Sequence, residues 1–370
     1  MTNIPNNEKH YKNIHITTEF GLQIFGGIGS LVKTLYENRT EDDLFIAFNL
    51  TEEACAVEDT SGVVFLMPQE FEEDFILKYK GDNIIFHNYL TGSYFIGNCK
   101  NITDYKLYNI SHSNPLYEHL FYKTTTQSEM VDMYYYVLEN LDGMIFISDY
   151  EKRLFMELKE QFKLKVKDTI RYITIYNGLE LSDGDFKLKS EEEHTNVYGY
   201  IGRLDARKGI IELLPHFKNL PDKTLYIATG GAGKFDVPMY WEFIDSFNFN
   251  NIHSNLLPLG FIQQQRKRLF FEKIDALIVP SLYEPFGLVL LEAFEYNRPV
   301  FCNKTGGILE ILGEDYPFYF DVFDEDELKR VSELYESMPK DELEKYFTDL
   351  KNSIRERYSA EQMVDGYKNI

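Results

Sequence analysis

The chain has 370 residues, 44% of them hydrophobic, which is long enough for two or three domains with their own cores. Its 60 acidic and 38 basic residues give a formal net charge of −22, which argues against a broad nucleic-acid footprint and against binding to an anionic membrane surface. Residues 1–20 lack the apolar core of a signal peptide, and no stretch approaches the roughly 18 apolar residues of a membrane span. The 3 cysteines are isolated, so we expect no disulfide framework and a reducing, cytoplasmic setting.

A short strand and a glycine-rich loop come first along the chain. Residues 13–18 alternate well enough for a strand, and Phe25-Gly26-Gly27-Ile28-Gly29 then leads into a helix predicted over 30–36. Glycine lets the backbone approach a ligand closely and adopt positive φ. Because many α/β proteins have such a loop, it is weak evidence for a binding site when taken alone.

Two histidines follow strand-like runs. His87 ends the run 83–87, and His112 ends the run 105–112. A neutral imidazole can donate one hydrogen bond and accept another, which suits contact with a sugar hydroxyl. A core histidine explains His87 at least as well, whereas His112, between Ser111 and Ser113, is the stronger site candidate.

A polar segment divides the chain. Residues 181–196 are charged and polar, unlike their apolar flanks, and strands and helices alternate on both sides. This pattern predicts two parallel sheets, with domains over 1–180 and 197–358, a linker over 181–196 and an amphipathic helix over 359–370. Asp183-Gly-Asp185 has the form of a metal motif, but it falls in the polar linker, so we expect no metal site there.

A basic turn opens the second half. Residues 197–201 look like a strand and 208–214 like a helix that stops or kinks before Pro215, so Arg203 lies in the turn between them and Lys208 at the helix start. Two cations at the carboxyl end of a strand, followed by a helix amino end, form an anion site. A solvated turn is the common alternative, but a basic cluster is unusual in so acidic a chain. We expect the third cation, Arg207, to face solvent.

Two glutamates follow the buried strand predicted at 276–280. Glu284 lies in the loop after this strand, where Pro285 interrupts regular secondary structure. Glu292 lies in the first turns of a helix predicted over 287–297. Ligands of open α/β sheets bind beyond the carboxyl ends of the strands, where backbone amides can meet a diphosphate and carboxylates can accept from hydroxyls. Either glutamate alone is most simply explained as an ordinary surface charge. The two together, with glycine and proline residues around them, favour a binding site.

These segments together resemble the retaining glycosyltransferases of family 4 and their glycogen synthase relatives, over nearly the whole chain. The resemblance rests on the E-x7-E spacing at 284–292, the G-R-x4-K-G pattern at 202–209 and the G-G-[ILV]-G loop at 26–29. It implies a GT-B fold, with two Rossmann-like domains whose parallel sheets face a central cleft, and a C-terminal helix that packs back on the first domain. Ile24 stands where glycogen and starch synthases usually have a lysine, which puts a polymer-synthase assignment in doubt.

The resemblance also implies the reaction. A hexose or N-acetylhexosamine would pass from a nucleotide diphosphate sugar, predicted to be a UDP-sugar, to an acceptor with retention of configuration, without metal or cofactor. Arg203 and Lys208 would hold the diphosphate, Glu284 a hydroxyl of the donor sugar, and Glu292 the ribose. His112 would lie by the anomeric carbon. The implied donor-binding set is Gly26, Gly27, Gly29, Arg203, Lys208, Phe286, Gly287, Leu288 and Glu292, and the implied catalytic set is His112, Glu284, Arg203 and Lys208.

Several alternatives stay open. The acceptor could be a soluble small molecule, a glycan, a protein or a modified DNA base, although the net charge argues against nucleic acid. Two rival functions are a nucleotide-sugar 2-epimerase, whose pattern of cleft residues we do not find, and a non-catalytic subunit that keeps the fold. The sequence defines neither the acceptor nor the oligomeric state.

Overall fold

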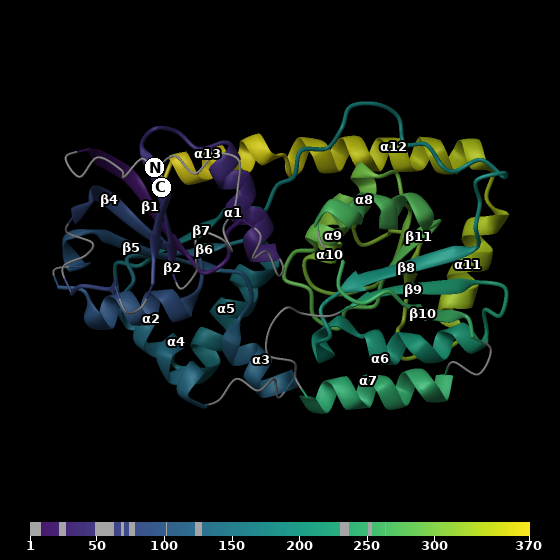
Figure 1. The fold of residues 1–370 in the computed structure, drawn as a ribbon, viewed down its shortest axis with the longest axis horizontal. Helices are drawn as coiled ribbons and strands as arrows, with labels where there is room; N and C mark the ends of the chain where they lie inside the picture. The colour runs from purple at the N-terminus through teal and green to yellow at the C-terminus, as the bar shows by residue number, and fades with distance from the viewer. Residues whose placement is uncertain are drawn as a thin grey trace. The chain divides into compact units, whose positions relative to one another are not determined.

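The computed structural model describes residues 9–21, 27–48, 63–67, 70–73, 78–100, 102–122, 128–229, 237–250, 254–262 and 264–370. The chain divides into two compact units, which are residues 1–178 with 360–370 and residues 179–359. Each unit is built on one parallel sheet with helices between its strands, as Figure 1 shows. The predicted α/β class with two Rossmann-like sheets is therefore confirmed.

The first unit has a seven-stranded sheet in the order β3-β2-β1-β4-β5-β6-β7. All its strand pairs are parallel, so their carboxyl ends meet at one edge. The strands are short apolar runs, and most of their side chains are buried, as expected for a parallel sheet covered on both faces. They are β1 (His10–Thr17), β2 (Asp43–Phe48), β3 (Val63–Leu66), β4 (Lys80–Phe86), β5 (Lys106–Ser111), β6 (Gly143–Phe146) and β7 (Arg171–Thr174).

Helices connect these strands. The helix α13 belongs to this unit although it ends the chain, because Asn13 Nδ2 donates to the Tyr367 carbonyl over 3.2 Å and α13 lies against α1. The helices of the unit are α1 (Gly27–Glu37), α2 (Tyr89–Asn98), α3 (Pro115–Tyr122), α4 (Ser128–Asn140), α5 (Asp149–Phe162) and α13 (Ala360–Lys368), with a 3₁₀ turn at Ile102–Asp104.

The second unit has a six-stranded parallel sheet in the order β10-β9-β8-β11-β12-β13. Because β8 and β11 are adjacent in its middle, the loops that follow these two strands share one stretch of the carboxyl edge. The strands are β8 (Val197–Gly202), β9 (Thr224–Thr229), β10 (Leu256–Pro258), β11 (Ala276–Val279), β12 (Val300–Asn303) and β13 (Tyr319–Phe320).

The helices of the second unit differ from the prediction in one place. Instead of one helix over 208–214, a 3₁₀ turn at Ala206–Lys208 is followed by α6 (Ile210–Leu213) and a second 3₁₀ turn at Leu214–Lys218. Gly209, at φ +64°, separates the 3₁₀ turn from α6, and the α-helix stops before Pro215 as predicted. The other helices are α7 (Val237–Asn250), α8 (Gln264–Lys273), α9 (Leu288–Glu295), α10 (Ile308–Leu312), α11 (Glu327–Ser337) and α12 (Lys340–Arg357).

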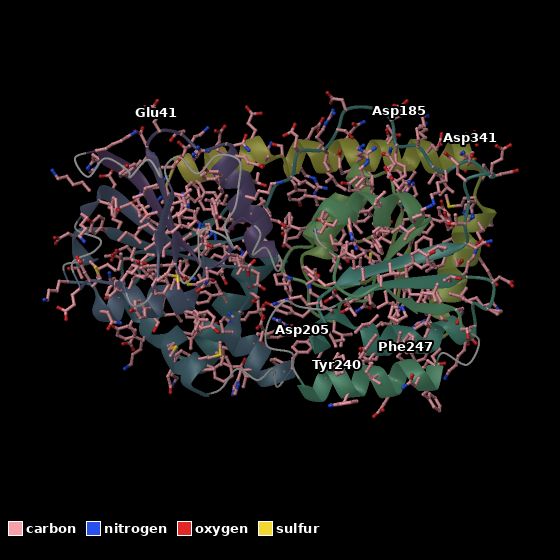
Figure 2. All side chains as sticks on the ribbon, in the orientation of Figure 1. Glu41, Asp185, Asp205, Tyr240, Phe247 and Asp341 are labelled. Atoms are coloured by element: carbon pink, nitrogen blue, oxygen red, sulfur yellow. The ribbon has the colours of Figure 1, made fainter. Side chains whose placement is uncertain are left out.

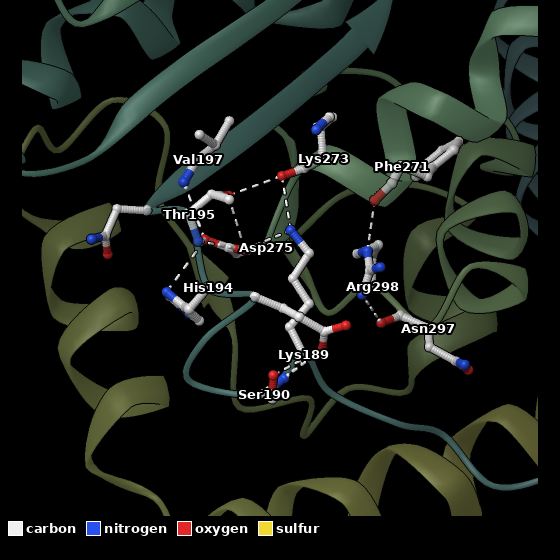
Figure 3. Close-up of polar contacts among 12 residues, drawn as sticks. Lys189, Ser190, His194, Thr195, Val197, Phe271, Lys273, Asp275, Asn297 and Arg298 are labelled. Carbon is white, nitrogen blue, oxygen red and sulfur yellow. Dashed lines mark hydrogen bonds and ion pairs between the residues drawn. The ribbon is translucent and has the colours of Figure 1, made fainter.

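The polar segment 181–196 is fastened to the second unit. Phe186 is buried against Phe347, with ring centroids 4.9 Å apart. Further along, the buried carboxylate of Asp275, which directly precedes β11, accepts from Lys189 Nζ over 2.9 Å and from the backbone amides of Thr195 and Val197 over 3.0 and 3.1 Å (Figure 3). One acidic side chain thus fixes the entry into β8 beside β11.

We expect Asp275→Asn to destabilise the protein by about 3–5 kcal/mol, because it leaves the Lys189 ammonium without its charged partner in a buried place. Asp185→Asn is the matched control, since the Asp185 side chain is 71% exposed in the same segment (Figure 2), and it should stay within about 0.5 kcal/mol. Urea unfolding of both variants measures the difference. Equal unfolding midpoints would show that Asp275 does not fasten the segment.

Three histidines lie on adjacent strands of the first unit or directly after them. His15 Nδ1 and His87 Nε2 are 3.1 Å apart in the core, and the His87 ring lies at 6.3 Å from that of His112 at an angle of 22°. Burial lowers the pKa of His15 to about 4 and that of His112 to about 3. Burial and the neighbouring imidazoles also hold the pKa of His87 well below its ordinary value.

These lowered pKa values predict acid sensitivity. Below the unfolded-state pKa of about 6.5, the unfolded chain binds protons that the buried imidazoles do not bind, so the free energy of unfolding falls by about 1.4 kcal/mol per pH unit for each histidine until its folded-state pKa is reached. In His15→Gln the decline between about pH 6.5 and 4.5 should be shallower by that amount. The exposed His10, changed to Gln, is the control. Identical slopes in His15→Gln and the wild type would contradict this assignment.

Candidate functional site

Two loops at the carboxyl edge of the second sheet are joined through their backbones. The amides of Leu282 and Tyr283, beyond β11, donate to the Arg207 carbonyl over 2.8 and 3.2 Å. Gly209 ends the turn after β8 with φ +64°, and a Cβ there would lie 2.1 Å from the carbonyl oxygen of Pro280. Only glycine fits this close approach, so the pattern at 202–209 and the segment after β11 form one rigid structure.

A third loop joins them. The Gly307 amide donates to the Glu284 carbonyl over 2.8 Å, and a Cβ on Gly307 would come within 2.5 Å of the Pro285 carbonyl. Gly287, at φ +111°, turns the chain into α9. The glycines that frame Glu284 in the sequence are therefore required by the close packing of three loops, and they hold the backbone around Glu284 in place.

Glu284 and Lys208 form an ion pair. Lys208 Nζ lies 2.7 Å from Glu284 Oε2, and the Ser281 hydroxyl donates to the same oxygen over 3.1 Å. The side chains are 21% and 10% exposed, so the pair lies at the surface of the loops without being freely solvated. The structure thus brings together two of the predicted site residues, one from each motif.

Glu292 lies in the second turn of α9 and pairs with a residue that the motifs do not include. Lys267 Nζ, in the first turn of α8, lies 2.6 Å from Glu292 Oε1. The two side chains are 22% and 18% exposed. Lys267 is one of the residues that sequence analysis missed, because it precedes Glu292 by 25 positions and only the fold brings them together.

The two arginines of the basic turn have opposite settings. Arg203 is 54% exposed at its side chain, and its guanidinium is 3.8 Å from Asp205 Oδ2, so its donors face outward from the sheet edge. Arg207 is buried, and its Nε lies 2.7 Å from Asp205 Oδ1, so the prediction that it faces solvent is wrong. The cause is Asp205, labelled in Figure 2, which caps the 3₁₀ turn and pairs with Arg207. The acid two positions earlier is the sequence signal that could have predicted this burial.

The backbone at the start of α9 offers further donors. Phe286 is buried with its ring edge against Tyr358, which fixes the backbone that leads to Gly287 and Leu288. No side chain caps this helix start. First-turn amides of a helix have no partner within the helix, so those of α9 can meet an anion. In the described part of the chain, no cluster of three or more His, Cys, Asp or Glu residues could hold a metal ion.

The first unit contains the remaining predicted site residues. His112 follows β5, and its Nε2 is buried without a hydrogen-bond partner among the described residues. Gly27 and Gly29 are in the first turn of α1, and the Gly29 amide donates to the Glu19 carboxylate over 2.9 Å. Gly26 and Ile24 lie outside the described residues. No helix in the described part is long and apolar enough to cross a membrane.

Comparison with known proteins matches the second unit to a family. Residues 183–352, which contain Arg203, Lys208, Glu284 and Glu292, match the model described as glycosyl transferases group 1. An uncharacterized glycosyltransferase of Methanocaldococcus jannaschii is 27% identical over 193 residues, which cover 46% of this chain and 47% of the relative. A glycogen synthase of Marinomonas sp. is 32% identical over 127 residues, covering 34% of this chain and 26% of that enzyme. The chain thus spans about half or less of these relatives.

Solved structures match both units together. Sucrose-phosphate synthase from Thermosynechococcus elongatus has a TM-score of 0.75 at 16% identity, over 97% of this chain and 98% of that one. HepE of Anabaena, solved in complex with UDP and glucose, has a TM-score of 0.72 at 16% identity, over 97% and 99%. The specific placement in family 4 stays a prediction. Residues 183–352 are thus similar to the glycosyl transferases group 1 family, and the whole chain has the GT-B fold.

Proposed function

We propose that this protein is a retaining glycosyltransferase that takes a hexose or N-acetylhexosamine from a UDP-sugar bound on its second unit. The observation that carries the proposal is the joined pair of loops, which holds Arg203, Lys208 and Glu284 at one sheet edge with the first turns of α9 beside them. HepE supports the choice of donor, because it has the same fold and was solved with UDP and with UDP-glucose.

The basic residues are proposed to hold the diphosphate. The exposed Arg203 guanidinium can give two parallel hydrogen bonds to phosphate oxygens, and the Leu288 amide can add another. Lys208 can move from Glu284 to a phosphate oxygen as the donor enters. In group transfer the diphosphate leaves with growing negative charge, and fixed cations at that point stabilise the transition state.

The two glutamates are proposed to bind the hydroxyl groups of the donor sugar and of the ribose. Glu284, held by Lys208 and Ser281, accepts from a hydroxyl of the donor sugar, and Glu292 accepts from the ribose hydroxyls. The proposal also includes His112 of the first unit as a residue beside the reacting carbon, since its buried Nε2 lacks a partner among the described residues. Because the cations in this scheme are side chains, we propose that the reaction needs no metal ion.

Calorimetric titration of UDP, with parallel turnover of the UDP-sugar, tests the division of roles. Glu292→Gln and Arg203→Ala should each weaken UDP binding about tenfold or more, because each loses a charge-assisted hydrogen bond to the nucleotide. Glu284→Gln should bind UDP as the wild type does or slightly more tightly, since Lys208 loses its carboxylate partner. Its turnover should fall at least about tenfold. Glu336→Gln is the matched control, because Glu336 pairs with Lys223 at the amino edge of the same sheet.

Different results would redirect the proposal. Wild-type turnover in both glutamate variants would rule out the proposed glycosyltransferase function and leave the fold without an assigned reaction. Release of an epimerised sugar without acceptor would indicate an epimerase instead. His112→Ala should leave UDP affinity unchanged and lower turnover, so a loss of UDP affinity in this variant would contradict its proposed place beside the sugar.

A further inference from the structure

The first turns of α8 and α9 meet at the carboxyl edge of the second sheet, where Lys267 contacts Glu292. The helix α8 begins beyond the carboxyl end of β10, and α9 begins beyond the carboxyl end of β11, so both start at the same edge. The far ends of the two helices are packed together as well. The Phe271 and Tyr296 rings stack at 4.9 Å, and Arg298 Nε donates to the Phe271 carbonyl over 2.6 Å. These contacts fix the position from which Lys267 reaches Glu292.

The Lys267 ammonium donates a hydrogen bond to one oxygen of the Glu292 carboxylate. It contacts Oε1 at 2.6 Å, and the carboxylate has no second partner within the described residues. Oε2 is therefore the oxygen that can accept from a ligand. A carboxylate has about four lone-pair sites, so the bond to Lys267 leaves enough capacity for two hydroxyl groups.

We propose that Lys267 is a positioning residue that presents the Glu292 carboxylate to the ribose of the nucleotide, an inference that rests on the proposed function. A glutamate side chain on a helix has several accessible rotamers, and the bond to Lys267 selects one before the ligand arrives. Selection in advance removes part of the ordering cost of binding.

A purely structural ion pair predicts something different. If Lys267 only tied α8 to α9, its loss would affect every ligand of the second unit to the same degree. If it positions Glu292, its loss should affect only ligands that have ribose hydroxyls. The discriminating probe is therefore the nucleotide itself, with and without those hydroxyls.

The experiment titrates UDP and 2′,3′-dideoxy-UDP into the full chain by calorimetry. Lys267→Met, which keeps the apolar stem, should bind UDP about tenfold more weakly than the wild type, while its affinity for the dideoxy nucleotide should stay within about twofold of the wild-type value. Lys223→Met is the matched control, since Lys223 forms a partly buried pair with Glu336 at the opposite edge, and it should change neither affinity. Should Lys267→Met fail to fold, Lys267→Gln is measured in the same way.

Three results would overturn the inference. An equal loss for both nucleotides would make Lys267 a structural residue. Unchanged affinity for both would make the contact irrelevant to binding, and tighter UDP binding would mean that Lys267 competes with the ribose. Failure of the wild type to bind UDP at all is a separate result, because it overturns the proposed function itself before Lys267 is tested.

Discussion

The backbone clamp between the turn after β8 and the loop after β11 is the constraint on which the rest of the candidate site depends. One carbonyl, that of Arg207, accepts from two amides of the facing loop, and Gly209 lies under Pro280 with no room for a side chain. The clamp puts Lys208 within hydrogen-bond distance of Glu284. Sites held in this way on rigid elements keep their geometry when charges change around them, which electrostatic catalysis requires.

Charge pairing gives the site its second property. The chain has a formal net charge of −22, yet the two motif glutamates each face a lysine and Asp205 faces two arginines. Without the cations of the basic turn, the carboxylates of Asp205 and Glu284 would repel a diphosphate. With them, the acidic side chains can accept hydrogen bonds from hydroxyl groups while Arg203 and the start of α9 remain available to phosphate. A site with four cations for three carboxylates, in an otherwise acidic protein, suits a ligand that combines an anion with sugar hydroxyls.

The sequence predicted the parts of this site that depend on local patterns. The strands before Arg203 and Glu284 are buried apolar runs. Positions 209, 287 and 307 require glycine for steric or backbone reasons, and a glycine is visible in the sequence. Contacts between segments that are distant in the sequence have no such local pattern and could not be predicted. Lys267 has the pattern of an ordinary helix charge until α8 and α9 are placed side by side, and the prediction that Arg207 faces solvent is wrong because its guanidinium pairs with Asp205. The helix predicted over 208–214 begins later than expected, because Gly209 at φ +64° ends the 3₁₀ turn at Ala206–Lys208 and α6 starts only at Ile210.

The proposed function requires the clamped loops of the second unit to bind the nucleotide diphosphate. Hydrogen–deuterium exchange with and without saturating UDP tests it directly, because amides that donate to phosphate exchange more slowly in the complex. We expect slower exchange over residues 203–209 and 286–292, with the effect lost in Arg203→Ala. Unchanged exchange in both segments, while calorimetry shows UDP binding, would mean that the nucleotide binds elsewhere and that these loops are not its site.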